Sequence, residues 1–170
     1  MEHTATFPGV APDQVFVEFT SSDFLLEFAA EVGVVSGELV TGEKAGVVTA
    51  DMPWSFPTDR DGIPSLARKL LPETVRLDWH QEWGPADRRP IPGSIKVVLH
   101  GTPSATVTST SHLVEQGADT QYRAATTTKT SLRWPVAGTV ESTIDKELVG
   151  WILKVQRRVL RRRLQLPEGD

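Results

Sequence analysis

The last third of the sequence joins a strand of alternating character directly to one long amphipathic helix. Between residues 122 and 134 the even positions carry small, apolar or aromatic side chains, whereas Arg123, Lys129 and Arg133 occupy odd positions. This period of two predicts a half-buried strand. Beyond Pro135 and Gly138, apolar residues recur every three or four positions, which predicts a helix with one apolar stripe. The stripe comprises Val140, Ile144, Leu148, Trp151, Ile152, Val155 and Val159.

The helix predicted from this stripe is about 28 residues, or roughly 40 Å, long. Strands that follow one another through short loops pair in antiparallel fashion, and a curved sheet of this kind buries one face. The long helix is the only predicted element able to cover that face. We therefore expect an α+β fold, in which a curved antiparallel sheet of six or seven strands wraps around the C-terminal helix and two short helices follow the first strand.

The other elements are indicated by periodicity and by turn residues. Strands are predicted at 4–7, twice within 34–52 around a hairpin loop at 41–46, and at 74–83, 94–101, 102–114 and 120–134. One short helix begins near Pro12, and a second has Ser22 as its N-cap and Gly33 as its left-handed end. Residues 53–64 are predicted to be irregular, and a short helix at 65–71 is closed by Pro72.

Composition limits the class of protein. A chain of 170 residues, 39% of them hydrophobic, suffices for one domain spanning 1–170. The absence of cysteine excludes disulfides and zinc–thiolate sites and suits a reducing cytoplasm. The first ten residues lack the pattern of an export signal, and no apolar run approaches the roughly 18 residues of a membrane span. We expect a soluble, cytoplasmic protein.

Charge is uneven along the chain. The formal net charge of −4 argues against nucleic acid as a partner, because phosphate contacts need a basic surface. Basic residues nevertheless gather at the end of the last helix: Lys154, Arg157, Arg158, Arg161, Arg162 and Arg163. One interpretation is a solvated helix end that complements the helix dipole. The other is a peripheral contact with anionic lipid or polyphosphate.

No catalytic constellation is evident. The four histidines, His3, His80, His100 and His112, lack the spacing of a zinc site. Neither a phosphate-binding glycine loop nor a serine elbow is present. We predict no metal and no cofactor, and the sequence leaves open whether the protein is an enzyme.

The threonines of the predicted last strand suggest a cavity. If Thr126, Thr128 and Thr130 face the sheet interior, each unpaired hydroxyl costs about 1–3 kcal/mol, so the row would need water or a polar ligand group. Small side chains also leave volume beneath the helix. The alternative is that threonine is simply a favourable strand residue on a partly exposed stretch.

A wall of apolar and aromatic residues could complete such a cavity, although a core position is the safer interpretation of each aromatic residue. The predicted ligand-binding residues are Leu77, Trp79, Trp83, Val97, Leu99, Tyr122, Thr126, Thr128, Thr130, Trp134, Leu148 and Trp151. Trp54 and Phe56, in the predicted irregular segment, could form a lid over it.

In element order the chain resembles the START-like, polyketide cyclase superfamily of helix-grip proteins, and more narrowly an uncharacterised bacterial family within it. The narrower resemblance rests on IPSLARKLL at 63–71, Trp83 and WPVAGTVE at 134–141. Pro72 departs from the glycine expected after the short helix, and the basic run is heavier than expected. The resemblance implies a bent sheet around a long helix with a cavity between them.

The sequence leaves three functions open. We expect binding of a small hydrophobic or amphipathic molecule, such as a lipid, polyketide or aromatic metabolite, in a cavity between sheet and C-terminal helix. The first alternative, implied by the resemblance, is a cyclase or aromatase, for which Tyr122 is the only phenol available as a proton shuttle. The second is a protein-interaction module. The oligomeric state stays open.

Overall fold

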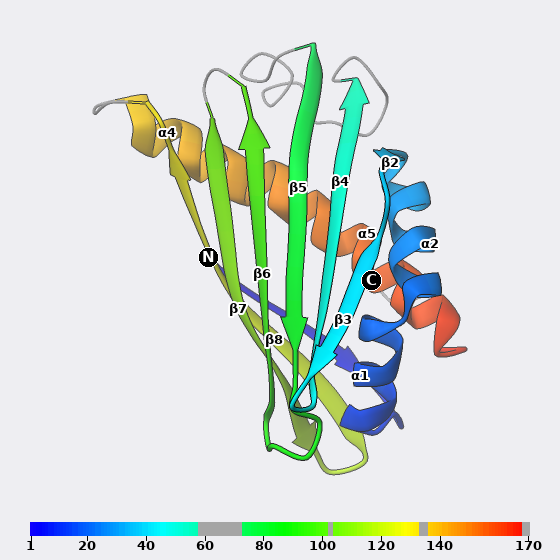
Figure 1. The fold of residues 1–170 in the computed structure, drawn as a ribbon. Coiled ribbons are helices and arrows are strands. Elements are labelled where there is room, and N and C mark those ends of the chain that lie inside the picture. The colour runs from blue at the N-terminus through cyan, green and yellow to red at the C-terminus, as the bar shows by residue number, and fades with distance from the viewer. Residues whose placement is uncertain (58–72, 102–103, 133–135, 168–170) are drawn as a thin grey trace.

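The computed structural model describes residues 1–57, 73–101, 104–132 and 136–167. Within these ranges an antiparallel sheet curves around one long helix, and two short helices close one end of the sheet (Figure 1). This is the fold class predicted from the sequence. The predicted helix at 65–71, the segment 63–71 and Trp134 lie outside the described residues.

The sheet has eight described strands in the order β1-β8-β7-β6-β5-β4-β2, with β3 also paired to β4. Every pairing is antiparallel. The strands are β1 Glu2–Phe7, β2 Val35–Ser36, β3 Val40–Lys44, β4 Val47–Pro57, β5 Thr74–Trp83, β6 Ile91–His100, β7 Ala105–Gln116 and β8 Asp119–Thr130. The prediction of six or seven strands omitted the two-residue strand β2.

The region of β3 and β4 differs from the prediction. Ala45 and Gly46 have φ of 52° and 76°, so a tight two-residue turn replaces the expected loop at 41–46. β4 then continues through Pro53. This proline lies between the part of β4 that pairs with β3 and the part that pairs with β2, so the N–H that proline lacks is not needed for a hydrogen bond between strands. Trp54 and Phe56 are buried strand residues, only 2% exposed, and the prediction of a lid is wrong.

Two short helices, α1 Pro12–Thr20 and α2 Ser22–Val32, follow β1. The N-cap of α2 is Ser21, whose Oγ accepts a 3.1 Å hydrogen bond from the Phe24 N–H, one residue before the predicted cap. Gly33 ends α2 with φ of 70°, as predicted. α2 therefore begins and ends at residues suited to those positions.

Aromatic rings attach these helices to the sheet. Phe19 of α1 stacks on Trp83 at a centroid distance of 5.0 Å, and Phe28 of α2 meets Trp79 edge to face at 5.5 Å. Gln81, 1% exposed, interrupts the apolar face of β5 and donates a 2.9 Å hydrogen bond from Nε2 to the Phe19 carbonyl. This end of the sheet is a filled core.

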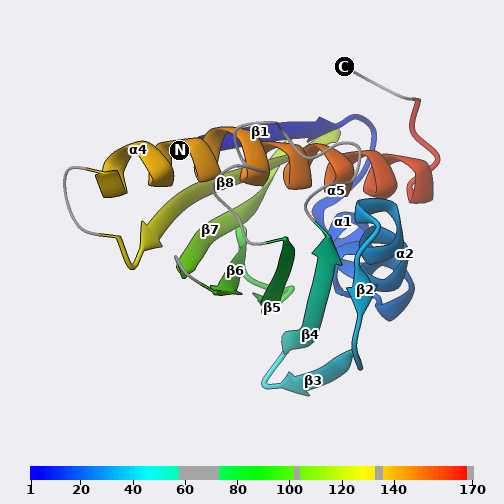
Figure 2. The same cartoon turned by 90° about the horizontal axis from the view of Figure 1, so that it is seen from above.

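The C-terminal helix, residues 136–163, crosses the concave face of the sheet (Figure 2). It consists of α4 Val136–Thr143, a π-helical segment Ile144–Val149 and α5 Gly150–Arg163. All residues of the predicted stripe are buried except Trp151, which is half-buried. The π-helical segment was not predicted, and such segments occur often at functional sites. No helix among the described residues combines the length and the apolar character needed to span a bilayer.

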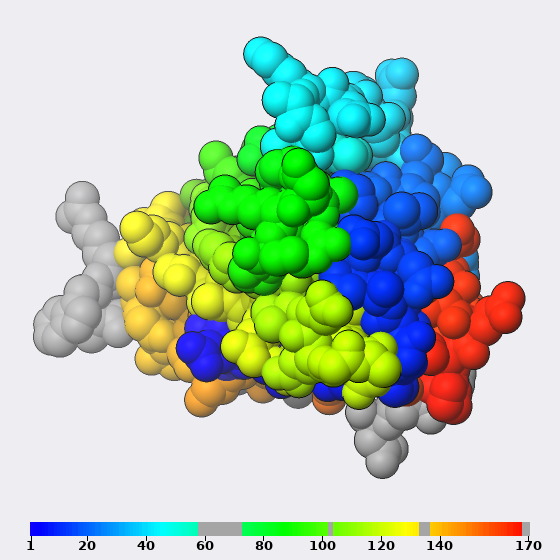
Figure 3. Space-filling view, turned by 90° about the horizontal axis from the view of Figure 1, so that it is seen from below, coloured from blue at the N-terminus to red at the C-terminus, as the bar shows by residue number. Residues whose placement is uncertain are grey.

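The basic end of α5 lies against α1 and α2 (Figure 3). Three of its arginines are paired with glutamates of those helices. The pairs are Arg158 with Glu31 at 3.2 Å, Arg162 with Glu27 at 2.6 Å and Arg163 with Glu18 at 2.6 Å. The hydrogen bond from Arg162 in particular lowers the pKa of Glu27. These ion pairs were not predicted from the sequence, which suggested either a solvated helix end or a contact with anionic lipid. Because three arginines are paired, less positive charge is free for a lipid contact.

Candidate binding pocket

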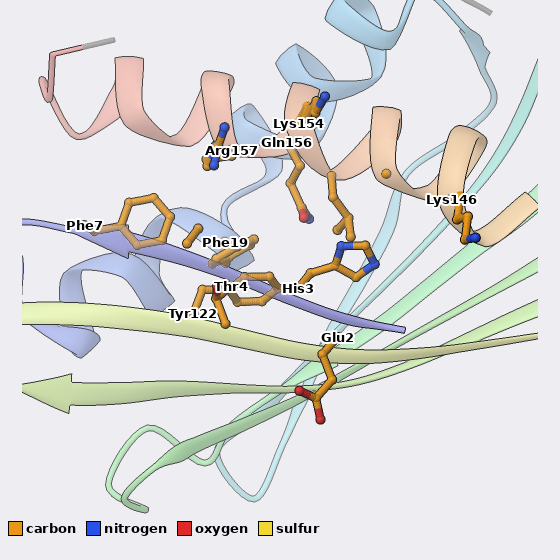
Figure 4. A pocket seen from close by; sticks show the side chains of 13 residues that line it. Glu2, His3, Thr4, Phe7, Phe19, Tyr122, Lys146, Lys154, Gln156 and Arg157 are labelled. Atoms are coloured by element: carbon orange, nitrogen blue, oxygen red, sulfur yellow. The ribbon is translucent and has the colours of Figure 1, made fainter. Parts of the chain in front are cut away.

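A well-lined hollow opens at the seam where β1 faces the C-terminal helix (Figure 4). It has a volume of about 380 Å³, at the lower end of the range usual for small-molecule sites. Its walls come from β1, α1, β8 and the helix. The lining residues are Glu2, His3, Thr4, Ala5, Phe7, Phe19, Tyr122, Lys146, Gly150, Leu153, Lys154, Gln156 and Arg157.

One wall is an edge of the sheet. β1 pairs with β8 on one side only, with Thr4 opposite Arg123 and Ala5 opposite Tyr122. Farther along this edge, Arg161 donates a 3.0 Å hydrogen bond to the Thr6 carbonyl and so ties β1 to the helix. The pocket lies beside this tie, where strand and helix separate.

Gln156 is the most unusual residue of the pocket. Its side chain is 2% exposed and extends from the helix toward β1, above Phe19 and Tyr122 (Figure 4). Its Nε2 has no hydrogen-bond partner among the described residues. A buried amide N–H without a partner costs about 1–3 kcal/mol, so this donor is suited to an acceptor that enters the pocket.

The floor is aromatic. Phe19 and Tyr122 lie with ring centroids 5.5 Å apart, and the Tyr122 hydroxyl is within 3.2 Å of Ser111 Oγ. Burial raises the pKa of Tyr122 to about 12, although hydrogen bonds from Ser111 and Ser109 lower it in part. A phenol that keeps its proton this firmly is poorly suited to shuttle protons near neutral pH. The floor therefore offers the pocket an apolar surface.

His3 links this pocket to the space beneath the helix. Its Nε2 lies 3.4 Å from the hydroxyl of Thr126, a residue that lines the inner cavity described next. Burial is the main factor that lowers the pKa of His3. The positive charge of the N-terminal ammonium group of Met1 lowers it further, whereas the negative charge of Asp145 raises it. The imidazole is consequently neutral near pH 7.

A second, inner cavity lies under the helix and is almost wholly apolar. It measures only about 40 Å³, room for roughly two or three water-sized groups. Leu153 lines both this cavity and the larger pocket, so the two are neighbours. The lining is Leu77, Trp79, Ile95, Val97, Leu99, Val107, Ser109, Thr126, Leu148, Val149, Ile152 and Leu153.

The threonine row does not need a ligand. Thr126 Oγ1 donates to the Met1 carbonyl at 3.2 Å, Thr128 Oγ1 donates to Asp145, and Thr130 Oγ1 donates to Glu141 at 3.3 Å. The premise that these hydroxyls lack protein partners is therefore wrong. Acidic residues of the C-terminal helix reach two of them, which fixes the helix on β8.

The structure distributes the predicted binding residues over several places. Those that line the inner cavity are Leu77, Trp79, Val97, Leu99, Thr126 and Leu148, and Tyr122 lines the larger pocket. Trp83, Thr128, Thr130 and Trp151 line neither of these two hollows. Trp83 instead stacks on Phe19 inside the filled end of the sheet. Trp134 lies outside the described residues.

The sequence reasoning missed Gln156, Gly150 and His3. Gln156 is a polar residue on the buried side of an otherwise apolar helix stripe, which is a usable sequence signal. Gly150 sits within a helix, where glycine costs about 0.5–1 kcal/mol relative to alanine, and that cost also deserves an explanation. His3 shares the inward face of β1 with Ala5 and Phe7.

A curved antiparallel sheet that holds a long C-terminal helix, with a pocket at their seam, defines a protein of the helix-grip class. The chain belongs to the family DUF2505, described as a protein of unknown function, whose model matches residues 2–164. A search of curated proteins found no match to the chain.

Proposed function

We propose that this protein binds a small amphipathic molecule in the pocket between β1 and the C-terminal helix. The observation that carries the proposal concerns Gln156, which lines this pocket and whose buried Nε2 lacks a partner among the described residues. A ligand acceptor group would relieve the cost of that unpaired donor. The aromatic floor would hold the apolar part of the ligand, at about 25 cal/mol per Å² of buried apolar surface.

The inner cavity extends this proposal. Leu153, half-buried and shared by both hollows, separates the polar pocket from the apolar cavity. A rotamer change of Leu153 would let an apolar tail pass from the pocket toward Trp79 and Leu148. The π-helical segment, which ends at Val149 one turn before Leu153, is a local departure from regular helix of the kind that occurs often at functional sites.

Gly150 fits the same interpretation. A Cβ at this position would meet no heavy atom closer than the Asp145 carbonyl oxygen at 4.0 Å, so glycine is not required by close packing. Its absent side chain instead leaves the pocket open on the helix side. Glycine at position 150 thus weakens the helix and keeps the pocket open, which supports the proposed binding site.

The proposal includes membership of the START-like superfamily, which the sheet-and-helix arrangement supports, and a cytoplasmic location, which the lack of cysteine supports. Catalysis is not part of it. The strongly held proton of Tyr122 argues against the cyclase alternative.

The test compares Gly150→Leu with Gly138→Leu. Both substitutions replace a glycine of the C-terminal helix, but Gly138 lies outside the pocket and has open space around it. Wild-type protein, released into denaturing solvent and analysed by mass spectrometry, should yield a co-purifying small molecule, or amphipathic compounds should raise its melting temperature. Gly138→Leu should retain this behaviour and Gly150→Leu should lose it. If wild type shows neither effect, or if both variants behave alike, the proposal is wrong.

A further inference from the structure

We infer that the ligand carries an anionic oxygen head group, a carboxylate or a phosphate, on an apolar tail. This inference rests on the proposed function and specifies the chemistry of its ligand. It depends on which charges face the pocket, which of them are already paired, and what hydrogen-bonding capacity the buried wall offers.

Three cations border the pocket on the helix side. Lys146, Lys154 and Arg157 are spaced by eight and three positions and follow one edge of the helix, with Gly150 between the two lysines. Lys146 and Lys154 are exposed and Arg157 is half-buried. The head group of a ligand held by Gln156 would lie between this basic edge and β1.

These cations differ from the rest of the basic helix in being unpaired. Arg158, Arg162 and Arg163 form ion pairs with Glu18, Glu27 and Glu31, and Arg161 donates to backbone carbonyls. Lys146, Lys154 and Arg157 form no ion pair with a described residue. Their charge is therefore available to a ligand.

Acidic groups near the pocket do not cancel this charge. Glu2 is the one carboxylate among the described lining residues, and Figure 4 shows its side chain directed away from the helix. Asp145, close enough to His3 to influence it, accepts a hydrogen bond from Thr128. The side chains of the helix wall thus offer N–H donors from Lys146, Lys154, Arg157 and Gln156. Such a wall is complementary to an oxyanion and repels a cationic head group.

The experiment compares ligands that share a tail. Calorimetric titrations of the full chain use decanoate, decyl phosphate, decan-1-ol and decylamine, and a 4-phenylbutyl series with carboxylate, alcohol and amine heads. At least one anion should bind about ten-fold more tightly than the alcohol with the same tail, and this preference should shrink as salt is added. The amine should bind most weakly. The ratio of decanoate to decyl phosphate affinity separates the two oxyanions.

A charge-matched pair of variants locates the effect. Lys154→Gln/Arg157→Gln should bind the anion and the alcohol nearly equally, with the affinity for the alcohol unchanged. Lys96→Gln/Lys129→Gln removes the same charge from exposed positions of β6 and β8 and should keep the wild-type preference. The inference is overturned if wild type binds anion and alcohol equally, or if both double variants lose the preference for the anion to the same extent. In either case the proposed function stands. Absence of binding by every compound overturns both.

Discussion

Thr128 of β8 donates a hydrogen bond through Oγ1 to the carboxylate of Asp145, the second residue of the π-helical segment. Two residues along the same strand, the Thr130 N–H donates a 2.8 Å hydrogen bond to Glu141 of α4. Strand and helix are thus joined by side-chain contacts on the side of the sheet where the inner cavity lies. The polar row fixes the position of the helix and so determines the dimensions of that cavity.

Replacing Thr128 by valine should lower the free energy of unfolding by about 1–3 kcal/mol, because the half-buried Asp145 carboxylate loses its donor while side-chain volume is kept. The control is Thr127→Val, at an exposed position one residue earlier. It should change stability by less than about 0.5 kcal/mol. Urea unfolding measures both. Equal effects at the two positions would show that the Thr128–Asp145 contact contributes nothing specific.

The two buried glutamines should respond in opposite directions to replacement by leucine. Gln81→Leu should destabilise the fold by about 1–3 kcal/mol, since it removes the donor to the Phe19 carbonyl. Gln156→Leu should leave the ligand-free protein equally stable, or more stable by about 1 kcal/mol, since it removes an unpaired buried N–H. Chemical unfolding of ligand-free protein decides. A large loss of stability in Gln156→Leu would mean that Nε2 has a partner and would remove the main support for the pocket.

Gly93 is predicted to be intolerant of any side chain. It lies opposite Trp83 across the β5–β6 pair, and a Cβ there would approach the indole ring to 2.4 Å. Gly93→Ala should therefore cost about 1–3 kcal/mol through displacement of Trp83 from its stack on Phe19. Gly138→Ala, in open space on the helix, should be neutral or stabilising by up to about 1 kcal/mol. Thermal unfolding measures the stability of both variants, and tryptophan fluorescence reports a displacement of Trp83. A Gly93→Ala variant with wild-type stability and fluorescence would contradict the described packing.

Tyr122 is the single tyrosine of the chain, so its ionisation can be followed directly by phenolate absorbance. Burial raises its pKa from 10.0 to about 12, which favours the protonated, native form. Its contribution to stability is therefore complete below pH 10 and is lost as pH rises toward 12. Native protein should show no phenolate at pH 10, whereas unfolded protein should be about half ionised. Phenolate in the native protein at pH 10 would contradict the buried position of the ring.

The sequence predicted correctly those helices and strands that are determined by neighbouring residues along the chain. The alternation of Val75, Leu77 and Trp79, the left-handed glycine at 33 and the apolar stripe of the C-terminal helix all appear as expected. The prediction of an irregular segment at Pro53 was wrong because proline usually disfavours a paired strand. Here the strand is tolerated because Pro53 lies between the residues of β4 that pair with β3 and those that pair with β2.

The pocket was harder to predict because its chemistry depends on pairings between distant residues. The basic helix end gave no sign that Glu18, Glu27 and Glu31 would neutralise some arginines and leave Lys154 and Arg157 free. The same holds for the threonine row, whose acidic partners come from another element. The local clues to the site were Gln156, a polar residue on the buried side of the apolar stripe, and Gly150, a glycine within the helix.

The most direct test of the account follows the side-chain amide of Gln156 by nuclear magnetic resonance, with Gln156→Leu used to assign its NH₂ signals. Addition of decanoate, decyl phosphate or the co-purified molecule should shift these signals together with those of His3, Phe19 and Tyr122. Saturable shifts confined to these residues are the predicted result. Shifts that leave Gln156 unmoved and appear instead on the outer face of β4 and β5 would contradict the account.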